Sequence, residues 1–409
     1  MISKLFDINN TILILTILLP IGMLIGTAVS EIIIISISFI FLIYMFKKKN
    51  EIIIDKYFYF LILIWLSLIL NYLLSINQEL SLLRSFGFFK YIIFIFAMKY
   101  LFSKNKNITF FFLFLIFIVL ITTFDIYYEN YYKKNILGFI SIDEKRIASF
   151  LRDELKIGYF LLGFSLISIG FYFEKIKNKK SLNLLIIGYF SILIILSAIW
   201  LTGEKANSLR ALICFFLFLF FIKNNFKLKK IILITIIILP ILIYFFSDRI
   251  KDRFDSYLLP EPSNISLLGA FQKSHHGAHY YTAFKIFLDY PFFGVGNKNF
   301  REQCSNAKYY NKSYERINER CSTHPHQIYL ELLSEHGLIG TTIILFVIFY
   351  SIFKSYINYK KNNNLIQLCT ILFLICNFLP VLPNGSFFTS FNASIFWFNY
   401  SLMLSYNKN

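Results

Sequence analysis

Long runs of apolar residues, separated by short polar segments, make up most of this 409-residue chain. The runs extend over about 15 to 22 residues, and about 20 helical residues at 1.5 Å each cross the hydrocarbon core of a bilayer. Inside lipid the backbone must satisfy its own hydrogen bonds, which favours helices. The runs are too long and too uniformly apolar for barrel strands. The pattern predicts an all-α polytopic membrane protein, with residues 1–409 forming one integral membrane domain.

Twelve runs qualify as candidate transmembrane helices. They lie near residues 11–29, 31–46, 56–75, 87–102, 108–126, 157–173, 184–201, 209–222, 231–247, 337–353, 365–382 and 392–406. The first run lacks a small-residue cleavage site and leads at once into the second, so we interpret it as a retained helix and not a signal peptide. The division into two spans is weakest near residues 28–31, where the turn is very short.

Lysines gather in alternate loops between the runs, which predicts the orientation in the membrane. These loops carry Lys47 to Lys49, Lys104 with Lys106, Lys175 to Lys180, Lys223 to Lys230 and Lys354 to Lys361. Positive residues mark cytoplasmic loops, so these loops and both termini are predicted to be cytoplasmic. The opposite, outer face then receives the segments 76–86, 127–156, 201–208, 248–336 and 382–391. The large 248–336 loop is expected to form a few helices that close over a cavity.

Composition agrees with this plan and changes the interpretation of the charge. The chain is 57% hydrophobic and 16% charged, whereas soluble domains are nearer a quarter charged. Its net charge of +18 would suit a nucleic-acid partner. The lysines, however, lie in short loops between apolar runs, as cytoplasmic loops require. We therefore predict contact with membrane lipids and no nucleic acid.

Two of the five cysteines, Cys304 and Cys321, share the large polar loop. If that loop is periplasmic, the two thiols are predicted to form a disulfide. The remaining three, Cys214, Cys369 and Cys376, fall in apolar runs and are interpreted as packing residues. The spacing of cysteines and histidines matches no structural zinc motif.

Two histidines, His324 and His326, stand where the large loop meets the next apolar run. Thr323 or His324 is predicted to cap the helix, with Pro325 and His326 in its first turn. The helix dipole there disfavours a cation and lowers the histidine pKa. A neutral imidazole can accept a proton from an attacking hydroxyl. The alternative is a histidine that only forms hydrogen bonds at the membrane interface.

A second histidine group, His275, His276 and His279, lies earlier in the same loop. Three histidines within five residues suit a metal, but no carboxylate completes a clear ligand set, so a polar pocket wall is favoured and no metal is predicted. The following segment contains Gly294 and Gly296. These glycines indicate either a tight turn that lets the backbone approach another group closely, or a plain loop.

Several cations fall on the predicted periplasmic face, where positive residues are uncommon. They are Arg146, Arg152, Lys205, Arg210, Arg249, Arg253, Lys298 and Arg301. An anionic ligand such as a lipid diphosphate would account for them, because guanidinium groups pair with phosphate oxygens. The alternative is pairing with local carboxylates: Arg146 with Asp143 or Glu144, Arg152 with Asp153 or Glu154, and Lys205 with Glu204. His279, His324, Lys298 and Arg301 are interpreted as supporting residues.

Four segments together resemble the O-antigen ligase and O-antigen polymerase superfamily. His326-Gln327, nine residues and then Gly337-Leu-Ile-Gly340 fit the ligase spacing. The other three are Phe287 to Phe300, which includes Gly294-Val-Gly296; Leu201-Thr-Gly-Glu-Lys-Ala206; and Arg146-Ile-Ala-Ser-Phe150. The resemblance spans about residues 140–345.

The resemblance implies a GT-C-like, metal-independent glycosyltransferase that needs no cofactor. Its donor would be a polyprenyl-diphosphate-linked glycan, and its acceptor a lipid A-core or other glycan. His326 would be the general base, and Arg146 and Lys205 would lie near the diphosphate. The family usually has arginine at the positions of Lys205 and His276; Arg210 is predicted to compensate for the first.

The leading hypothesis is a glycan ligase that transfers a polysaccharide from its carrier to a lipid A-core sugar hydroxyl. The first alternative is a polymerase that joins lipid-linked repeats; the histidine-to-glycine spacing favours the ligase. The second is a transporter of lipid-linked sugars, which would carry charges and broken helices within its spans. The predicted spans are nearly free of charge, except for Lys90 and Lys99 near the ends of one span.

Overall fold

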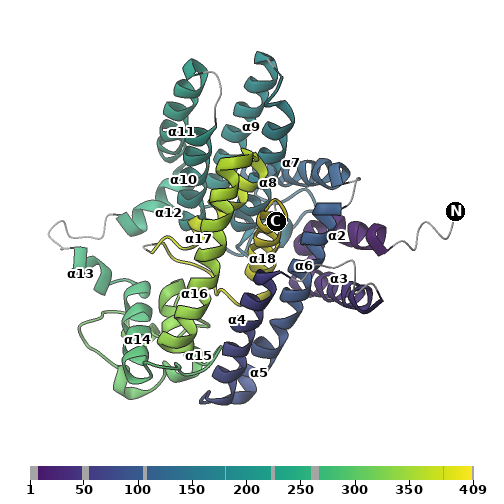
Figure 1. Cartoon of the computed structure of the whole chain (residues 1–409). Helices are drawn as coiled ribbons and strands as arrows, with labels where there is room; N and C mark the ends of the chain where they lie inside the picture. The colour runs from purple at the N-terminus through teal and green to yellow at the C-terminus, as the bar shows by residue number, and fades with distance from the viewer. Residues whose placement is uncertain are drawn as a thin grey trace.

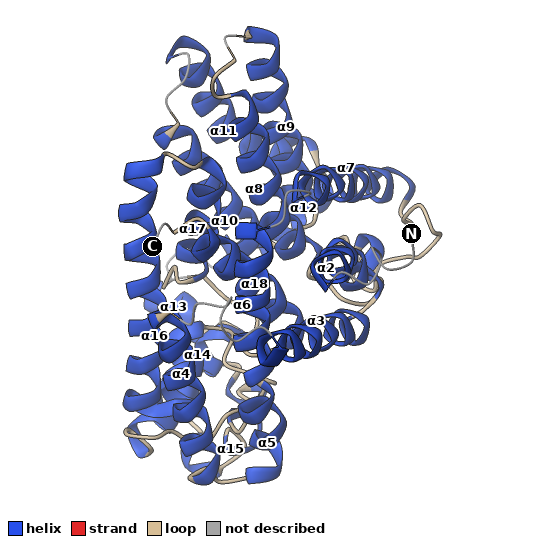
Figure 2. Cartoon of the chain, turned by 45° about the vertical axis from the view of Figure 1, so that its right-hand side comes forward, coloured by secondary structure: helices blue, strands red, loops and turns tan. Residues whose placement is uncertain are grey.

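The computed structural model describes residues 8–47, 55–104, 108–179, 181–222, 226–258, 267–380 and 382–407. These residues form helices and loops, with no strand among them (Figures 1 and 2). Every predicted span falls on a helix. The helices are α2 (Ile8–Ile25), α3 (Thr27–Lys47), α4 (Lys56–Leu73), α6 (Phe89–Lys104), α7 (Ile108–Tyr132), α8 (Ile157–Ile176), α9 (Leu182–Leu201), α10 (Lys205–Phe221), α11 (Phe226–Phe246), α16 (Ile328–Asn362), α17 (Leu365–Asn377) and α18 (Ser390–Ser405). The all-α polytopic prediction is confirmed.

Nine helical segments in the described part of the chain are long and apolar enough to cross a membrane. The predicted spans at α10, α17 and α18 are shorter, with 17, 13 and 16 residues. The shortest, α17, packs against α8, α10, α16 and α18. Irregular backbone at membrane depth is tolerated where protein surrounds it. The buried position of α17 therefore explains how so short a helix is accommodated.

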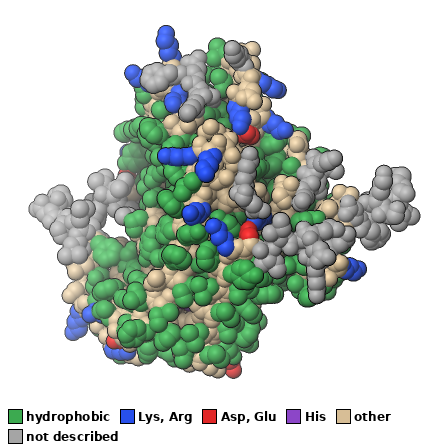
Figure 3. Space-filling view, viewed as in Figure 1, with side chains coloured by type: hydrophobic (Ala, Val, Ile, Leu, Met, Phe, Trp, Pro, Cys, Tyr) green, Lys and Arg blue, Asp and Glu red, His purple; other side chains and the backbone are tan. Residues whose placement is uncertain are grey.

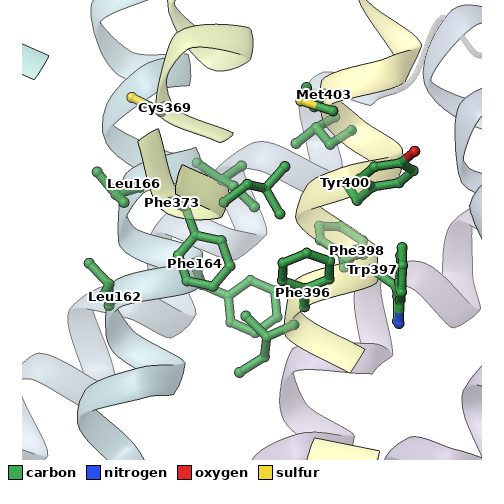
Figure 4. Close-up of a cluster of buried hydrophobic side chains, with 14 of the residues drawn as sticks. Leu162, Phe164, Leu166, Cys369, Phe373, Phe396, Trp397, Phe398, Tyr400 and Met403 are labelled. Atoms are coloured by element: carbon green, nitrogen blue, oxygen red, sulfur yellow. The ribbon is translucent and has the colours of Figure 1, made fainter. Parts of the chain in front are cut away.

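Apolar side chains cover much of the surface and also fill the centre of the bundle. Figure 3 shows hydrophobic side chains over most of one face, and large exposed residues include Phe39, Phe110 and Phe245. A lipid-facing surface accounts for this exposure. At the centre, Phe164 of α8, Phe373 of α17 and residues of α18 pack together (Figure 4). The buried helices α8, α17 and α18 thus form the frame on which the outer loops rest.

The large outer segment forms short helices that pack on this frame. They are α12 (Asp248–Leu258), α13 (Leu267–Gln272), α14 (His275–Asp289), α15 (Phe300–Gln303) and the 3-10 turns η2 (Ala307–Tyr309) and η3 (Ile317–Glu319). α14 packs along α16, and a small core around Ile286, Val295 and Phe300 joins the segment internally. Two other outer elements are α5 (Gln78–Gly87) and η1 (Ser149–Leu151). The C-terminal end of α7 extends into the predicted 127–156 loop, and the N-terminal end of α16 extends into the predicted 248–336 loop.

The two glycines of the Gly294-Val-Gly296 segment let its backbone approach a kink in α16. Gly337 interrupts α16 with φ 63° and ψ −169°, and Gly294 has φ 69°. A Cβ on Gly294 would lie 2.5 Å from the carbonyl oxygen of Glu335, and one on Gly337 would lie 2.4 Å from that of Phe292. Hydrogen bonds from Val295 N to Ser334 O and from Leu338 N to Pro291 O cross this contact at 2.9 and 2.7 Å. Of the two interpretations of these glycines, the structure agrees with the first, a close approach of the backbone to another group.

Cys304 and Cys321, the pair that the sequence predicted, are joined in a disulfide whose Cα atoms lie 5.3 Å apart. We expect Cys321→Ser to lower the free energy of unfolding by about 3 kcal/mol, because the open loop gains conformational entropy when unfolded. The loss of transfer activity should be small beside this loss of stability, since the bridge lies outside the histidine group. Thermal unfolding of the purified protein measures the first effect. A thiol assay that labels both cysteines in denatured, unreduced protein would contradict the pairing.

Candidate functional site

His326 lies just outside the N-terminus of α16, and the predicted cap was wrong. The helix begins at Ile328, and Gln327 caps it by accepting a hydrogen bond from Leu330 N to its Oε1 at 2.7 Å. His326 has φ 60°, a left-handed conformation that cannot continue a right-handed helix. The cap at Gln327 therefore lies four residues after Thr323 and three after His324, the two predicted caps. His326 still lies at the end of the helix where the dipole disfavours a cation.

Four histidines from two segments meet at this position. Ser274 caps α14 by accepting from Gly277 N at 2.9 Å, and this start sets His276 and His279 one turn apart. The ring centroid of His326 lies 4.1 Å from that of His324, 5.3 Å from that of His279 and 5.7 Å from that of His276. The two histidine motifs of the sequence thus form one cluster. Among the described residues, no group of three or more His, Cys, Asp or Glu has the arrangement of a metal site.

The backbone around His326 is held by Asn384, from the loop between α17 and α18. Asn384 N donates to His326 O at 2.8 Å, and Tyr280 Oη donates to the same oxygen at 3.4 Å. His324 Nε2 lies 3.2 Å from Asn384 O, so both histidines are fixed to this loop. Within the described parts of the chain, the His326 imidazole itself makes no hydrogen bond. The ring is positioned by its backbone and left available.

Burial keeps these histidines neutral. It lowers the pKa of His326 to about 3, with smaller contributions from the neighbouring His324, His279 and His276. Burial likewise lowers the pKa of His276 and of His324 to about 4. A histidine that charges must give up hydration and face other imidazoles, both of which disfavour the cation. At neutral pH the cluster therefore presents unprotonated nitrogen atoms.

These pKa shifts predict that acid destabilises the outer segment. The folded histidines have pKa values near 3 to 4, below the ordinary value of about 6.5, so the unfolded chain binds more protons in this interval. Stability from the cluster is complete above about pH 6.5 and declines as the pH falls toward 4. We expect a lower Tm at pH 5 than at about pH 7.5. Replacing His276 and His324 by asparagine should shrink this difference, and an equal Tm at both pH values would contradict the shifts.

Cations lie beyond His276, where two of the family-like segments meet. Ile147 N donates to Thr202 O at 3.1 Å and Arg253 Nε donates to Gly203 O at 3.4 Å, which brings Arg146 and Lys205 to one region. Arg253 acts electrostatically on both of these residues, and Lys205 acts on His276. Burial is the main cause that lowers the pKa of Arg146. Positive potential therefore reaches the histidine cluster from this side.

For Arg146, Arg152 and Glu204, the contacts in the described part of the chain differ from the local ion pairs that the sequence suggested. The Arg146 guanidinium donates through Nη2 to Leu155 O at 2.6 Å. Glu204 turns inward, where it accepts from Gly158 N and Asn207 Nδ2, both at 2.6 Å. Arg152 lies over the Phe139 ring at 4.1 Å. The carboxylate of Glu204 thus caps α8.

Arg210 is buried and committed to protein contacts. It is 2% exposed and donates through Nε to Cys376 O at 3.2 Å and through Nη1 to Asn207 Oδ1 at 2.9 Å. Its Nη2 donates to Pro383 O at 2.7 Å and to Asn384 Oδ1. These bonds favour a positioning role over the predicted contact with a diphosphate, because they fix the loop that holds His326.

A second group of cations lies near His324. Arg301 Nη2 donates to Thr323 O at 3.4 Å, and Lys298 N donates to the buried Glu335 at 2.8 Å. Arg84 and Lys156 act electrostatically on His324 together with Arg301. Sequence reasoning missed Arg84 and Asn384. Neither lies in a motif, and only the packing of segments far apart in the chain reveals them.

Comparison with known proteins gives one family. Residues 190–347 match the family model of the O-antigen ligases, from α9 to the first half of α16. The matched range includes Lys205, His276 and His326. No protein in a curated set matches the chain. The match confirms the resemblance to the O-antigen ligase superfamily. It indicates that the chain is a multi-pass bacterial membrane protein and an enzyme that acts on lipid-linked glycans.

Proposed function

Because residues 190–347 match the O-antigen ligases, we propose that this chain is a glycan ligase of the bacterial inner membrane. It transfers a polysaccharide from a polyprenyl-diphosphate carrier to a sugar hydroxyl of lipid A-core. With the lysine-rich loops and both termini in the cytoplasm, the site faces the periplasm. The observation that carries the proposal is the neutral, half-buried His326 imidazole, whose neighbours His276 and His324 lie in the field of nearby cations.

His326 acts as the general base of this proposed reaction. The acceptor hydroxyl attacks the anomeric carbon of the donor, a new carbon–oxygen bond forms, and the bond to the diphosphate breaks. The hydroxyl proton passes to the imidazole of His326. A pKa near 3 makes a weak base, but a bound diphosphate adds negative charge and raises the histidine pKa toward the working pH. Donor binding thereby prepares the base.

Lys205 and Arg146 stabilise the departing diphosphate. Positive groups placed where negative charge develops lower the barrier, a role that a metal ion fills in other transferases, so the reaction is metal-independent. Lys205 supplies charge without the bidentate geometry of arginine. His276, whose pKa is about 4, contacts the phosphate region as a neutral group. Lys205 and Arg146 therefore supply the positive charge on this side.

The polymerase remains the second candidate, because both reactions use the same base and diphosphate chemistry. The spacing from His326 to Gly337 favours the ligase. Transport has less support: Lys90 is ion-paired with Glu31 and Lys99 with Asp55, so these two cations have partners near helix ends.

Deleting the gene in its host tests the proposal. Polymer that accumulates on the polyprenyl carrier, together with bare lipid A-core, supports the ligase. Core capped with a single repeat makes the protein a polymerase. Unchanged lipopolysaccharide overturns both assignments.

A further inference from the structure

A cavity on the predicted periplasmic side is lined by Arg84 and Lys156, two cations that act electrostatically on His324. It has a volume of about 530 Å³, within the usual range of ligand pockets. Its walls come from α3, α5, α6 and α18, with Lys156 at the start of α8. The residues that the argument uses are Glu31, Arg84, Lys90, Lys156, Phe391 and Trp397.

Arg84 is the cation in this wall whose charge is left for a ligand. Lys90 is paired with Glu31, and Lys156 with Glu154 at 2.5 Å. Among the described residues, no carboxylate lies within 4 Å of the Arg84 guanidinium, and its Nη1 is buried without a hydrogen-bond partner. A buried guanidinium nitrogen without a partner is costly. An anion in the cavity would satisfy it.

Two nearby carboxylates are already engaged elsewhere. Glu331 accepts from Ser386 Oγ and from Phe387 N, the latter at 3.0 Å. Glu335 accepts from Lys298 N at 2.8 Å and from Phe300 N at 3.3 Å. Both act on Arg84 only through their fields. Arg84 therefore lines the cavity without a carboxylate partner among the described residues, and phosphate is the group that an arginine fork matches best.

One side of the wall is aromatic, which suits a lipid. Trp397 packs edge-on against Phe88 with centroids 5.3 Å apart, and Phe388 and Phe391 complete this side. Aromatic residues with one polar edge are typical of the membrane–water boundary. A ligand of this cavity should thus carry both a phosphate and apolar chains.

One loop connects the cavity to the catalytic candidate. Asn384 holds His326 and His324. Thr389 follows five residues later in the chain, and Thr389 and its neighbours line the cavity. Lys205 acts electrostatically on His276, whereas Arg84 and Lys156 of the cavity act on His324. A transferase needs two substrates to meet at its base, and the two cationic groups reach different neighbours of His326.

We propose that the Arg84 cavity binds the phosphorylated part of the acceptor glycolipid, while the donor diphosphate lies on the Lys205 side. The assignment rests on the proposed transferase function. It names the acceptor as a phosphate-bearing, membrane-anchored glycolipid. An ordinary anionic phospholipid shares this chemistry, so the experiment must separate the two.

The test measures binding to the purified full chain by native mass spectrometry, with diphosphoryl lipid A as the probe. We expect Arg84→Gln to weaken binding about tenfold or more, since it removes a charge-assisted contact. Arg84→Lys should restore part of the affinity. Arg316→Gln, which removes an exposed arginine paired with Glu319, is the matched control and should bind normally.

Competition separates the two lipid sources. Phosphatidylglycerol that displaces lipid A at equal concentration would assign the cavity to a membrane phospholipid and overturn the acceptor role. Unchanged lipid A binding by Arg84→Gln would overturn the site itself. If that variant fails to fold, a chain with Trp65→Phe and Trp200→Phe leaves Trp397 as its single tryptophan. Its emission must then change when lipid A binds, and an unchanged emission overturns the site.

Kinetics separate this inference from the proposed function. Arg84→Gln should raise KM for the acceptor about tenfold, with kcat and the donor KM unchanged. A protein that binds lipid A through Arg84 but transfers no glycan would contradict the ligase and leave the cavity assignment intact. A protein that transfers glycan, but whose acceptor KM is unchanged by Arg84→Gln, would contradict the cavity assignment and leave the ligase function intact.

Discussion

We expect His326→Ala to abolish the proposed glycan transfer while the amount of folded protein in the membrane stays unchanged. The substitution removes the proposed base, and general-base catalysis is worth about 10²- to 10⁴-fold in rate. Folding should tolerate the change because the contacts at this position come from the backbone: His326 O accepts from Asn384 N and Tyr280 Oη. The measurement is transfer from the lipid carrier by purified protein, normalised to protein level.

His275→Ala is the matched control for this prediction. His275 lies on the same outer segment, but it pairs at the surface with Glu319 and Arg316, away from the ring cluster. Its loss should leave the transfer rate unchanged. Normal transfer by His326→Ala would end the base assignment, whereas equal losses in both variants would indicate a general disturbance of the segment.

The helical frame could be predicted from the sequence because each span is encoded locally. Apolar runs near 20 residues have a single stable solution in lipid. All twelve predicted runs fall on helices, and even the buried α17 was visible as an apolar run. Its short length could not be predicted from the apolar run, because α17 is surrounded by protein and need not match the bilayer.

The site could be predicted only in part. The motifs pointed to His326 and His276, but not to their meeting across 50 residues of chain. The cap was placed wrongly because Gln327 outcompetes Thr323 and His324, and because His326 adopts a left-handed conformation that local propensity does not reveal. Asn384 and Arg84 act through packing between distant segments. No local pattern marks such residues.

Arg210→Lys is expected to reduce transfer about 100-fold, although the charge is kept, because a small misplacement of reacting groups costs about that much. A lysine cannot reproduce the fork that joins Cys376 O, Pro383 O and Asn384 Oδ1. Hydrogen bonds to charged groups contribute about 1.5–3 kcal/mol each, so the loop between α17 and α18 should loosen. His326, which this loop holds, then loses its fixed position. Rates and thermal stability of the purified variant measure both effects.

The positioning role predicts a specific pattern of non-additive losses. Asn384→Ala should reproduce the loss in kcat, and the double variant with Arg210→Lys should be little worse than either alone, because both act through one loop. Donor KM should change less than kcat. Direct contact of Arg210 with the diphosphate predicts the opposite, a raised donor KM and additive losses. Arg320→Lys is the control: its guanidinium also donates to backbone carbonyls, those of Cys304 and Ser305, which do not belong to this loop, so transfer should persist.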